Sequence, residues 1–222
     1  MITVHHLNHS RSQRVLWLLE ELGVHYEMVT YERDPKTLLA PDALKKIHPL
    51  GKSPVIVDGN ATLAESGAIL EYLVETYGNG RLVPVKGTQH FLDYRYFMHY
   101  AEGSLMPYLL LKLIFGKIKT AKVPFFVKPI SNKIADKVMA DFVTPNLVRH
   151  VAFLGEHLEK NKWFAGDELT VADIQMSYAV EALESRSKDM AISPKILELA
   201  KRMRERPAYQ RALAKGGPVI PD

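Results

Sequence analysis

The chain has 222 residues, 47% of them hydrophobic, which is enough for packed cores in one large domain or two modest ones. Its formal charge is +4, from 29 basic and 25 acidic side chains that are mostly interspersed, so charge does not indicate a nucleic-acid partner. The absence of cysteine excludes disulfides, thiolate metal sites and a cysteine nucleophile.

The N-terminal segment, Met1 to His6, carries neither the basic region nor the long apolar run of a secretory signal. No apolar run further along approaches the ~18 residues that a membrane span needs. We therefore expect a cytoplasmic protein without a membrane partner.

The first predicted elements are a strand, a turn and a helix. Alternating apolar residues over 2–7 predict the strand, and a polar turn at 8–12 follows. Apolar residues at helical spacing over 13–22 predict the helix, which a glycine ends. Ser10 or Ser12 is placed to cap its start.

A second strand, a short helix and a hairpin follow. Residues 26–31 are rich in strand-forming types, and 42–47 suit a short helix before a proline and a glycine. The β-branched run at 55–57, a tight Asp-Gly turn and a partner strand at 61–64 predict the hairpin. Helical spacing over 69–77 predicts the helix after it.

Three polar or unusual residues mark this hairpin. Pro54 opens a strand although proline donates no hydrogen bond to a sheet, so it suits the first strand position, in either the trans or the cis form. Glu65 and Ser66 lie where a helix exposes unpaired N–H groups, and their chemistry suits either helix capping or ligand binding.

The order over residues 1–78 is thus β-α-β-α-β-β-α. The helix between the first two strands makes them parallel, whereas the later pair is antiparallel. This order describes a thioredoxin-like domain, followed by a linker at 79–88 that is rich in glycine and proline.

Residues 89–222 predict an all-helical domain. We expect a long helix over 89–115 with a kink at Pro107, and a loop over 116–129 with at most short helical pieces. A long helix with one apolar face and a bend at Pro145 follows. The apolar face is formed by Ile134, Val138, Phe142, Leu147, Val151, Leu154 and Leu158. The last predicted helices span 172–184, 194–204 and 207–214.

The segment Leu169-Thr170-Val171-Ala172-Asp173-Ile174 fits a capping box. In this arrangement the Thr170 side chain accepts from the Asp173 amide, and the Asp173 carboxylate accepts from the Thr170 amide. The alternative hypothesis makes Asp173 a catalytic carboxylate. Capping alone explains both residue types and their spacing.

Four motifs occur in order along the chain. They are SRSQRVLWLLEEL at 10–22, HPLGKSPV at 48–55, LAESGAI at 63–69 and LTVADI at 169–174. Together they resemble those of cytosolic-type glutathione transferases, especially fungal and bacterial members, over nearly the full chain.

This resemblance implies a glutathione-binding site in the first domain. It implies that Pro54 is cis and that the Ser53 backbone pairs with the cysteinyl part of glutathione. It also implies that Glu65 and Ser66 hold the γ-glutamyl end and that Lys52 lies near the glycyl carboxylate. These roles fit an extended peptide that adds to a strand edge, with its carboxylate at a helix N-terminus.

The resemblance further implies that the glutathione thiol, with a pKa of ~8.5, is held as a thiolate near the turn at 8–12. A helix N-terminus and a hydroxyl or amide donor both stabilise an anion there. An ungapped count from Gly23-Val24 puts the serine of theta-like relatives at His9, flanked by Asn8 and Ser10. We rank Ser10 first as the donor, ahead of Asn8 and His9. In an alternative, Ser10 only caps the helix and backbone amides activate the sulfur.

The acceptor site is expected between the two domains, bounded by the turn and by Leu105, Met106, Tyr108 and Leu109. Tyr108 is either a donor to the acceptor or a core residue. Apolar walls with few polar groups would accept many small hydrophobic electrophiles.

The resemblance thus implies a detoxifying, homodimeric glutathione S-transferase, with peroxidase activity as a possible addition. The alternative is a non-catalytic binding or interaction module that keeps the pocket. No metal is expected, because strand alternation separates the neighbouring histidines His5 and His6.

Overall fold

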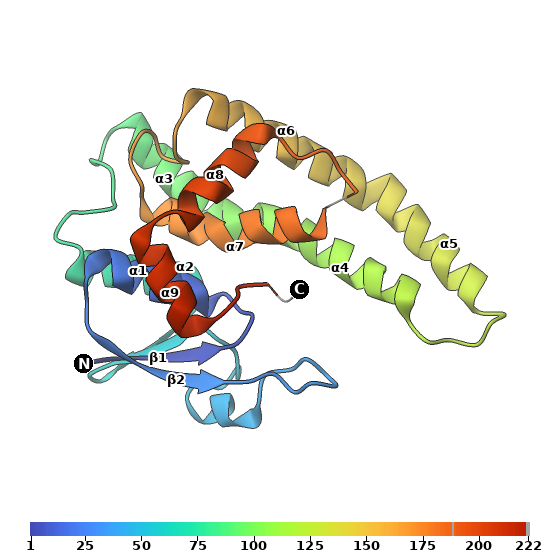
Figure 1. Cartoon of the computed structure of the whole chain (residues 1–222), viewed down its shortest axis with the longest axis horizontal. Helices are drawn as coiled ribbons and strands as arrows, with labels where there is room; N and C mark the ends of the chain where they lie inside the picture. The colour runs from blue at the N-terminus through green and yellow to red at the C-terminus, as the bar shows by residue number, and fades with distance from the viewer. Residues whose placement is uncertain (188, 221–222) are drawn as a thin grey trace.

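The computed structural model describes residues 1–187 and 189–220 and begins with one mixed sheet (Figure 1). The strands are β1 (Ile2–Leu7), β2 (Tyr26–Tyr31), β3 (Val55–Asp58) and β4 (Ala61–Ala64), in the order β2-β1-β3-β4. β1 is parallel to β2 and antiparallel to β3, and β3 and β4 form the hairpin. The predicted β-α-β-α-β-β-α order and the thioredoxin-like fold class are confirmed.

The helices of this half are α1 (Ser12–Leu22), the short 3₁₀ helix η1 (Asp42–Lys46) and α2 (Ser66–Tyr77). α1 ends at Gly23, whose φ of 70° lies in the left-handed region that glycine adopts without a Cβ clash. The N–H of Gly23 donates to the carbonyl of Leu19 and so satisfies one of the last free carbonyls of the helix.

The second half of the chain is helical, as predicted. Its α-helices are α3 (Gln89–Tyr100), α4 (Met106–Thr120), α5 (Lys128–Val138), α6 (Thr144–Lys160), α7 (Val171–Arg186), α8 (Pro194–Arg204) and α9 (Pro207–Gly216). Two π-helical segments, η2 (Ala101–Leu105) and η3 (Met139–Val143), join α3 to α4 and α5 to α6. No helix within the described ranges is long and apolar enough to cross a membrane.

Each π segment ends two residues before a proline, Pro107 or Pro145. A proline ring clashes with the carbonyl four residues earlier in a regular α-helix, and the wider π turn relieves that clash. The kinks predicted at these prolines therefore take the form of π turns on their N-terminal side.

Two expectations about this half are wrong. Gly116, placed in a predicted loop, lies inside α4, because the cost of ~1 kcal/mol for a helical glycine is offset where α4 packs on α5. Ile134 and Phe142, predicted on a buried face, are exposed. Helical spacing identified residues on one side of the helix but not what covers that side.

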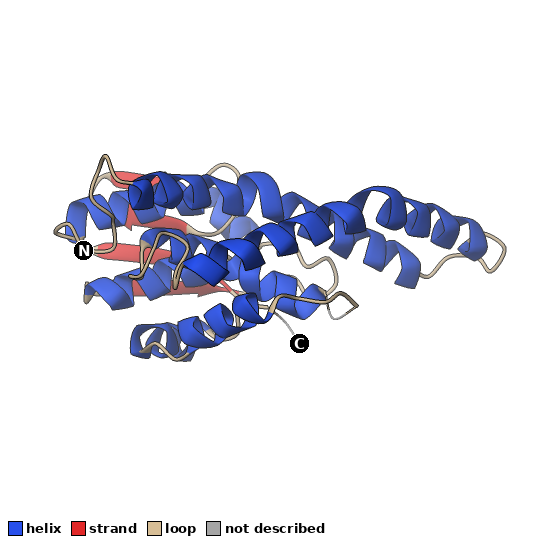
Figure 2. Cartoon of the chain, turned by 90° about the horizontal axis from the view of Figure 1, so that it is seen from above, coloured by secondary structure: helices blue, strands red, loops and turns tan. Residues whose placement is uncertain are grey.

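α1 is the central helix of the molecule and is buried along nearly its whole length. The sheet lies against one side of it, and α7 and α9 pack on the other (Figure 1). Viewed from above, the helical half extends well past the sheet (Figure 2). The end of β1 and the start of α1 therefore lie where the two halves meet.

Candidate functional site

The segment before β3 is joined directly to the end of β1. The Ser53–Pro54 peptide bond is cis, as the family resemblance implied. The Ser53 hydroxyl donates to the carbonyl of His5 (2.8 Å) and accepts from the N–H of Leu7 (3.2 Å). These bonds hold Ser53 beside the turn that follows Leu7.

The backbone of Ser53 keeps its own hydrogen-bonding groups free. Neither its N–H nor its carbonyl has a partner within residues 1–187 and 189–220. Lys52 is exposed and forms no ion pair in the same ranges. A free amide and carbonyl at the end of a strand offer an edge to which another peptide can pair.

Glu65 and Ser66 lie at the start of α2, close to the free strand edge at Ser53. Glu65 has a φ of 73° and its side chain makes no capping hydrogen bond. Ser66 is buried, and its hydroxyl has no hydrogen-bond partner in the described part of the chain. The Glu65 carboxylate is therefore exposed beside a helix N-terminus, which favours ligand binding over capping.

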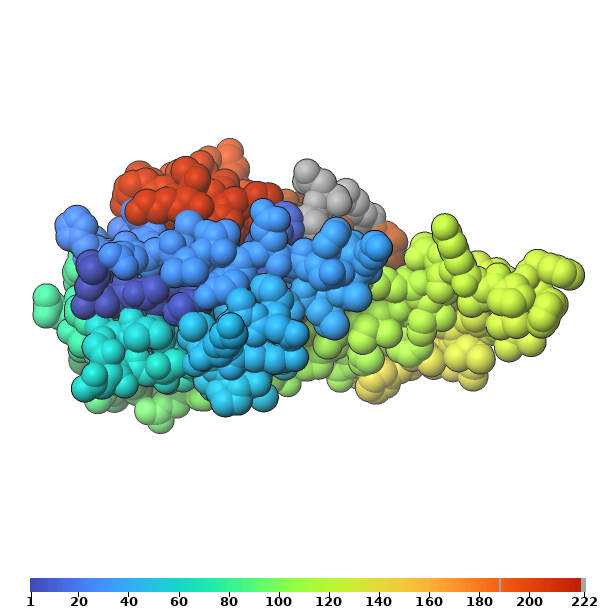
Figure 3. Space-filling view, turned by 90° about the horizontal axis from the view of Figure 1, so that it is seen from below, coloured from blue at the N-terminus to red at the C-terminus, as the bar shows by residue number. Residues whose placement is uncertain are grey.

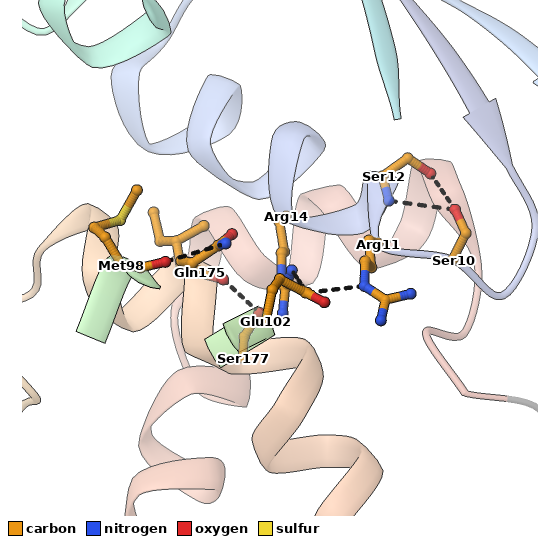
Figure 4. A network of polar contacts seen from close by, with 9 residues as sticks. Ser10, Arg11, Ser12, Arg14, Met98, Glu102, Gln175 and Ser177 are labelled. Carbon is orange, nitrogen blue, oxygen red and sulfur yellow. Dashed lines mark hydrogen bonds and ion pairs between the residues drawn. The ribbon is translucent and has the colours of Figure 1, made fainter. Parts of the chain in front are cut away.

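The hydroxyl of Ser10 is turned into the protein. Ser10 is only 4% exposed, and its Oγ lies 2.7 Å from the carbonyl of Leu7 and 2.7 Å from the Ser12 hydroxyl (Figure 4). It also accepts from the Ser12 N–H at the start of α1 (3.3 Å). The Ser10 hydroxyl has only one proton, and both groups that can accept it, the Leu7 carbonyl and the Ser12 hydroxyl, are buried.

His9 is directed to the C-terminal segment. Its Nδ1 lies 3.2 Å from the carbonyl of Pro218, so Nδ1 carries the proton and donates it. In the neutral ring Nε2 is then an acceptor and cannot donate to an anion. The backbone of His9 has a φ of 50°.

Asn8 is the third predicted donor. Its Oδ1 accepts from the N–H of Arg33 (2.9 Å), and its backbone carbonyl accepts from Nε of Arg33 (3.2 Å). The side-chain Nδ2 has no partner in the described ranges. Of the three predicted donors at the turn, Asn8 therefore has N–H protons that no protein group uses.

A charged cluster that sequence reasoning missed lies next to the turn (Figure 4). Glu102 of η2 accepts from Nε of Arg11 (2.8 Å) and from Nη1 of Arg14 (2.6 Å), and the Arg11 guanidinium lies 4.8 Å from the ring centre of Tyr178. An arginine pair at i and i+3, one of them next to the apolar run 15–19 of the helix, was the available signal. The cluster ties the turn to the helical half.

The electrostatics of Arg11 extend to Glu65. Burial lowers the pKa of the Arg11 guanidinium. The hydrogen bond and charge of Glu102, together with the charges of Tyr178 and Glu65, raise this pKa by more than burial lowers it, so the net shift is upward. Neither Nη group of Arg11 has a hydrogen-bond partner among the described residues. The turn thus carries a permanent positive charge with free N–H groups, close to the start of α2.

The residues expected to line an acceptor pocket are divided by the structure. Leu105, Met106 and Leu109 are buried in the core, and none of them borders the cavity next to Tyr108. Tyr108 is half-buried and borders a cavity of about 360 Å³ with residues that include Phe142 and His150. No residue of the turn borders that cavity.

Histidine and carboxylate side chains do not gather into a metal-binding group within residues 1–187 and 189–220. His5 has its Nδ1 2.9 Å from the Tyr31 hydroxyl, whereas His6 has its Nδ1 2.8 Å from the Ser12 hydroxyl. The two neighbouring rings therefore have different partners on the two faces of β1.

Two family models match the chain. One described as "Glutathione S-transferase, N-terminal domain" covers residues 1–75, and one described as "Glutathione S-transferase, C-terminal domain" covers residues 120–215.

Named relatives agree with these models. Glutathione S-transferase 3 of Schizosaccharomyces pombe is 35% identical over 184 residues, which cover 83% of this chain and 75% of that protein. Glutathione S-transferase 1 of Saccharomyces cerevisiae is 36% identical over 188 residues, 82% of this chain and 80% of that protein. The crystal structure of a glutathione S-transferase from Actinobacillus pleuropneumoniae is 31% identical, with a TM-score of 0.73 over 97% of this chain and 93% of that one.

Proposed function

The chain belongs to the glutathione S-transferase family, and from this premise we propose how its residues bind glutathione and activate the sulfur. It is a transferase that joins alkyl or aryl groups to the sulfur of glutathione. The proposal concerns the site: the tripeptide lies along the Ser53 edge, with its sulfur at the turn formed by residues 8–12.

The unpaired backbone of Ser53 supports the first part of this proposal. In the proposed pose, the cysteinyl residue of glutathione pairs with the free N–H and carbonyl of Ser53, as an added strand would. Lys52 then attracts the glycyl carboxylate. Pro54 and the Ser53 hydroxyl hold this edge against β1.

The exposed carboxylate of Glu65 supports the second part. It receives the α-amine of the γ-glutamyl group, while the α-carboxylate of that group lies at the N-terminus of α2, near Ser66. This assigns both residues to ligand binding.

Sulfur activation rests on Asn8 and Arg11. Asn8 Nδ2 donates a hydrogen bond to the thiolate, and the positive charge of Arg11 and the N-terminus of α1 stabilise it further. Ser10, the first-ranked donor from sequence, instead holds the turn through Leu7 and Ser12. Asn8 has N–H protons without a partner in the described ranges, whereas the single proton of the Ser10 hydroxyl has buried acceptors.

Substitution at the turn tests this assignment. We expect Asn8→Ala to raise the pKa of bound glutathione by about one to two units and to lower kcat/KM roughly 10- to 100-fold, because one hydrogen bond to a charged group is lost. Ser10→Ala, the matched control, should shift that pKa less. The pKa is read from thiolate absorbance in the ultraviolet against pH. A larger shift in Ser10→Ala would return the donor role to Ser10.

A second prediction concerns Glu65. Replacing Glu65 with alanine removes an interaction with the substrate amine that is equally strong in the ground state and in the transition state. We therefore expect KM for glutathione to rise about tenfold with little change in kcat. Steady-state kinetics and calorimetric titration with glutathione measure this. An unchanged KM would assign Glu65 to the structure of the α2 start alone.

The acceptor is proposed to be a small hydrophobic electrophile, and hydroperoxides are proposed as a second class of substrate. Conjugation of a generic aryl halide and glutathione-dependent reduction of an organic hydroperoxide, measured on one preparation, give the balance between them. Glutathione binding with turnover of neither substrate class would favour the non-catalytic alternative.

Family membership also supports a homodimer, a cytoplasmic location and a role in detoxification. In the proposed dimer the first half of one subunit packs on the helical half of the other. The exposed side chains of Leu92 and Tyr96 on α3, which border a cavity of about 450 Å³, support α3 as part of the contact. Sedimentation equilibrium of the Tyr96→Ser variant against the parent protein tests this.

A further inference from the structure

A helical arm extends beyond the rest of the molecule. It comprises residues 112–137, which are most of α4, the loop 121–127 and α5, and it projects to one side in every view (Figures 1, 2 and 3). α5 packs along α4, so the arm is a helical hairpin that carries its loop at the far end.

The end of the arm is apolar and exposed. Phe125 and Phe126 are 87% and 66% exposed, and their rings pack edge-to-face on each other at 5.6 Å. Ile130 and Ile134, on successive turns of α5, are 62% and 58% exposed. Large apolar side chains grouped in this way on a surface mark a site of interaction.

The backbone at this end is already paired within the arm. The N–H groups of Val127 and Lys128 donate to the carbonyl of Pro124 at 2.9 and 3.2 Å, and Pro124 itself has no N–H. Nζ of Lys128 donates to the carbonyls of Lys119 and Ala121 at the end of α4. Paired backbone groups lower the cost of moving the loop out of water.

The arm also carries the positive charge of the protein. It contains seven lysines and one aspartate, a net charge of +6, so the rest of the chain has 22 basic and 24 acidic side chains and a net charge of −2. No acidic residue occurs from 113 to 135. Lys117, Lys122 and Lys133 are exposed and have no ion-pair partner among residues 1–187 and 189–220.

We propose that the helical arm docks the enzyme on an anionic lipid surface. Phe125 and Phe126 enter the interfacial layer of the bilayer, and Lys117, Lys122 and Lys133 lie against the acidic headgroups. Apolar insertion combined with lysines is the pattern of peripheral membrane binding. Two copies of the arm packed together would instead place one net charge of +6 against another, and the two arms would repel each other.

The proposal departs from the expectation of no membrane partner, which rested on membrane spans and average charge. Docking of this kind needs no span, because only side chains and a loop enter the interface. Hydrophobic electrophiles concentrate in lipid, so docking places a conjugating enzyme where such substrates partition. This use rests on the proposed acceptor class, but the docking itself does not.

Vesicle co-sedimentation of the full-length protein tests the proposal. We expect the protein to sediment with vesicles of phosphatidylcholine and phosphatidylserine, to bind pure phosphatidylcholine vesicles much more weakly, and to be released by high salt. Phe125→Ser with Phe126→Ser should lower the partition coefficient at least tenfold. Each of Lys117→Gln, Lys122→Gln and Lys133→Gln should lower it about fivefold, and the arm triple variant, which combines the three, should lower it further.

Matched controls lie elsewhere on the surface. Val85→Ser with Leu39→Ser removes two exposed apolar side chains, and Lys86→Gln, Lys160→Gln and Lys162→Gln together remove the same charge as the arm triple variant. Neither control should change partitioning. Aryl halide conjugation in solution should be the same for all of these variants, which shows that they fold.

A tryptophan reporter gives an independent measurement. Trp17 and Trp163 are buried, so the fluorescence of Phe125→Trp reports the arm, and brominated phosphatidylcholine mixed with phosphatidylserine should quench it but not that of Val85→Trp. Absence of sedimentation with acidic vesicles, or binding that both arm variants leave unchanged, would overturn the proposal. If the protein instead self-associates, the phenylalanine variant abolishes this association, and no vesicle binding is seen, then the partner of the arm is a second copy of the chain and not a lipid surface.

Discussion

At the scale of single residues, the turn at 8–12, beside the proposed sulfur site, is held by buried hydrogen bonds that define which atoms carry protons. His6 Nε2 lies 2.9 Å from the carbonyl of Gly216, so it carries the proton, and Nδ1 must accept from the Ser12 hydroxyl. Burial lowers the pKa of His6, which favours this neutral ring. These buried hydrogen bonds hold the turn in place, while Nδ2 of Asn8 has no partner among the described residues.

The residue types at this turn were visible in the sequence, but the direction of each hydrogen bond was not. Asn8, His9 and Ser10 all carry possible donors, and only their neighbours in space, Arg33, Pro218 and Leu7, decide which are free. Arg33 and Pro218 lie far away along the chain. For this reason the sequence could name three candidate donors for the proposed thiolate, but not which of them keeps an N–H or O–H proton free of other protein groups.

Another buried titratable group allows a pH prediction. Burial raises the pKa of the Glu181 carboxyl to about 7, although the Tyr209 hydroxyl donates to it at 2.6 Å. A raised carboxyl pKa means that the folded state binds the proton more tightly than the unfolded state, whose pKa is ~4.3. The stability this gives is present below pH ~4.3 and is lost as the pH rises to about 7.

Glu181→Gln removes this titration but keeps an oxygen that accepts from Tyr209. We expect the stability of the variant relative to the parent to increase between about pH 4 and pH 7, by up to roughly 3 kcal/mol. Urea unfolding at several pH values measures the difference. The exposed Glu159→Gln should show no such trend, and a flat difference for Glu181→Gln would mean that the carboxyl is ionised in the fold.

At the scale of elements, α7 begins with the predicted capping box, which the structure confirms. The Asp173 carboxylate accepts from the N–H of Thr170 (2.8 Å), the Thr170 hydroxyl (2.9 Å) and the N–H of Phe164 (2.7 Å). The third bond, across the loop before α7, was not predicted. Asp173 therefore fastens both the helix start and the preceding loop, and it has no contact with the turn.

Loss of Asp173 should destabilise the protein without changing its chemistry. We expect Asp173→Ala to lower the free energy of unfolding by about 2–4 kcal/mol, because three buried donors lose their acceptor. Urea unfolding and kcat of the folded variant are the measurements, with the exposed Asp167→Ala as the control. A large fall in kcat at unchanged stability would support the catalytic hypothesis for Asp173.

Other elements show what periodicity can and cannot predict. Strand and helix boundaries in the first half were close, because short alternating runs, an Asp-Gly turn and a stop glycine are local signals. In the second half, local signals identified helices but not the arm, since Ile134 and Phe142 look like core residues until their surroundings are known. The average charge likewise concealed the lysines that gather in this one hairpin.

At the scale of the whole molecule, the Glu102 cluster joins the two halves at the site. Burial raises the pKa of the Glu102 carboxyl, but the guanidinium groups of Arg14 and Arg11 lower it more, so the net shift is downward and Glu102 is ionised. Arg14 is fully buried, and its Nε and Nη2 have no partner in the described part of the chain. The charge of Arg14 therefore depends heavily on one carboxylate from the helical half.

Breaking this cluster should affect stability and catalysis together. We expect Glu102→Gln to cost about 3–5 kcal/mol, because it leaves a buried guanidinium without its counter-charge. Arg14→Met combined with Glu102→Leu should recover much of that loss, yet leave conjugation slow, since Arg11 no longer has its partner. Urea unfolding and kcat/KM test both. A Glu102→Gln variant within 1 kcal/mol of the parent would show that the cluster contributes little to stability.

The packing of α9 on α1 has a consequence for how the protein is made. Tyr209 of α9 packs edge-to-face on Trp17 of α1, and Gly216 supplies the carbonyl to which His6 donates. α1 leaves the ribosome early, whereas α9 follows only after the whole helical half has been translated. A nascent chain can therefore form the strand edge at Ser53 while Trp17 is still uncovered and the turn at 8–12 still lacks the contact of His6 with Gly216. Translation that stops before α9 yields a product that lacks these contacts behind the turn at 8–12.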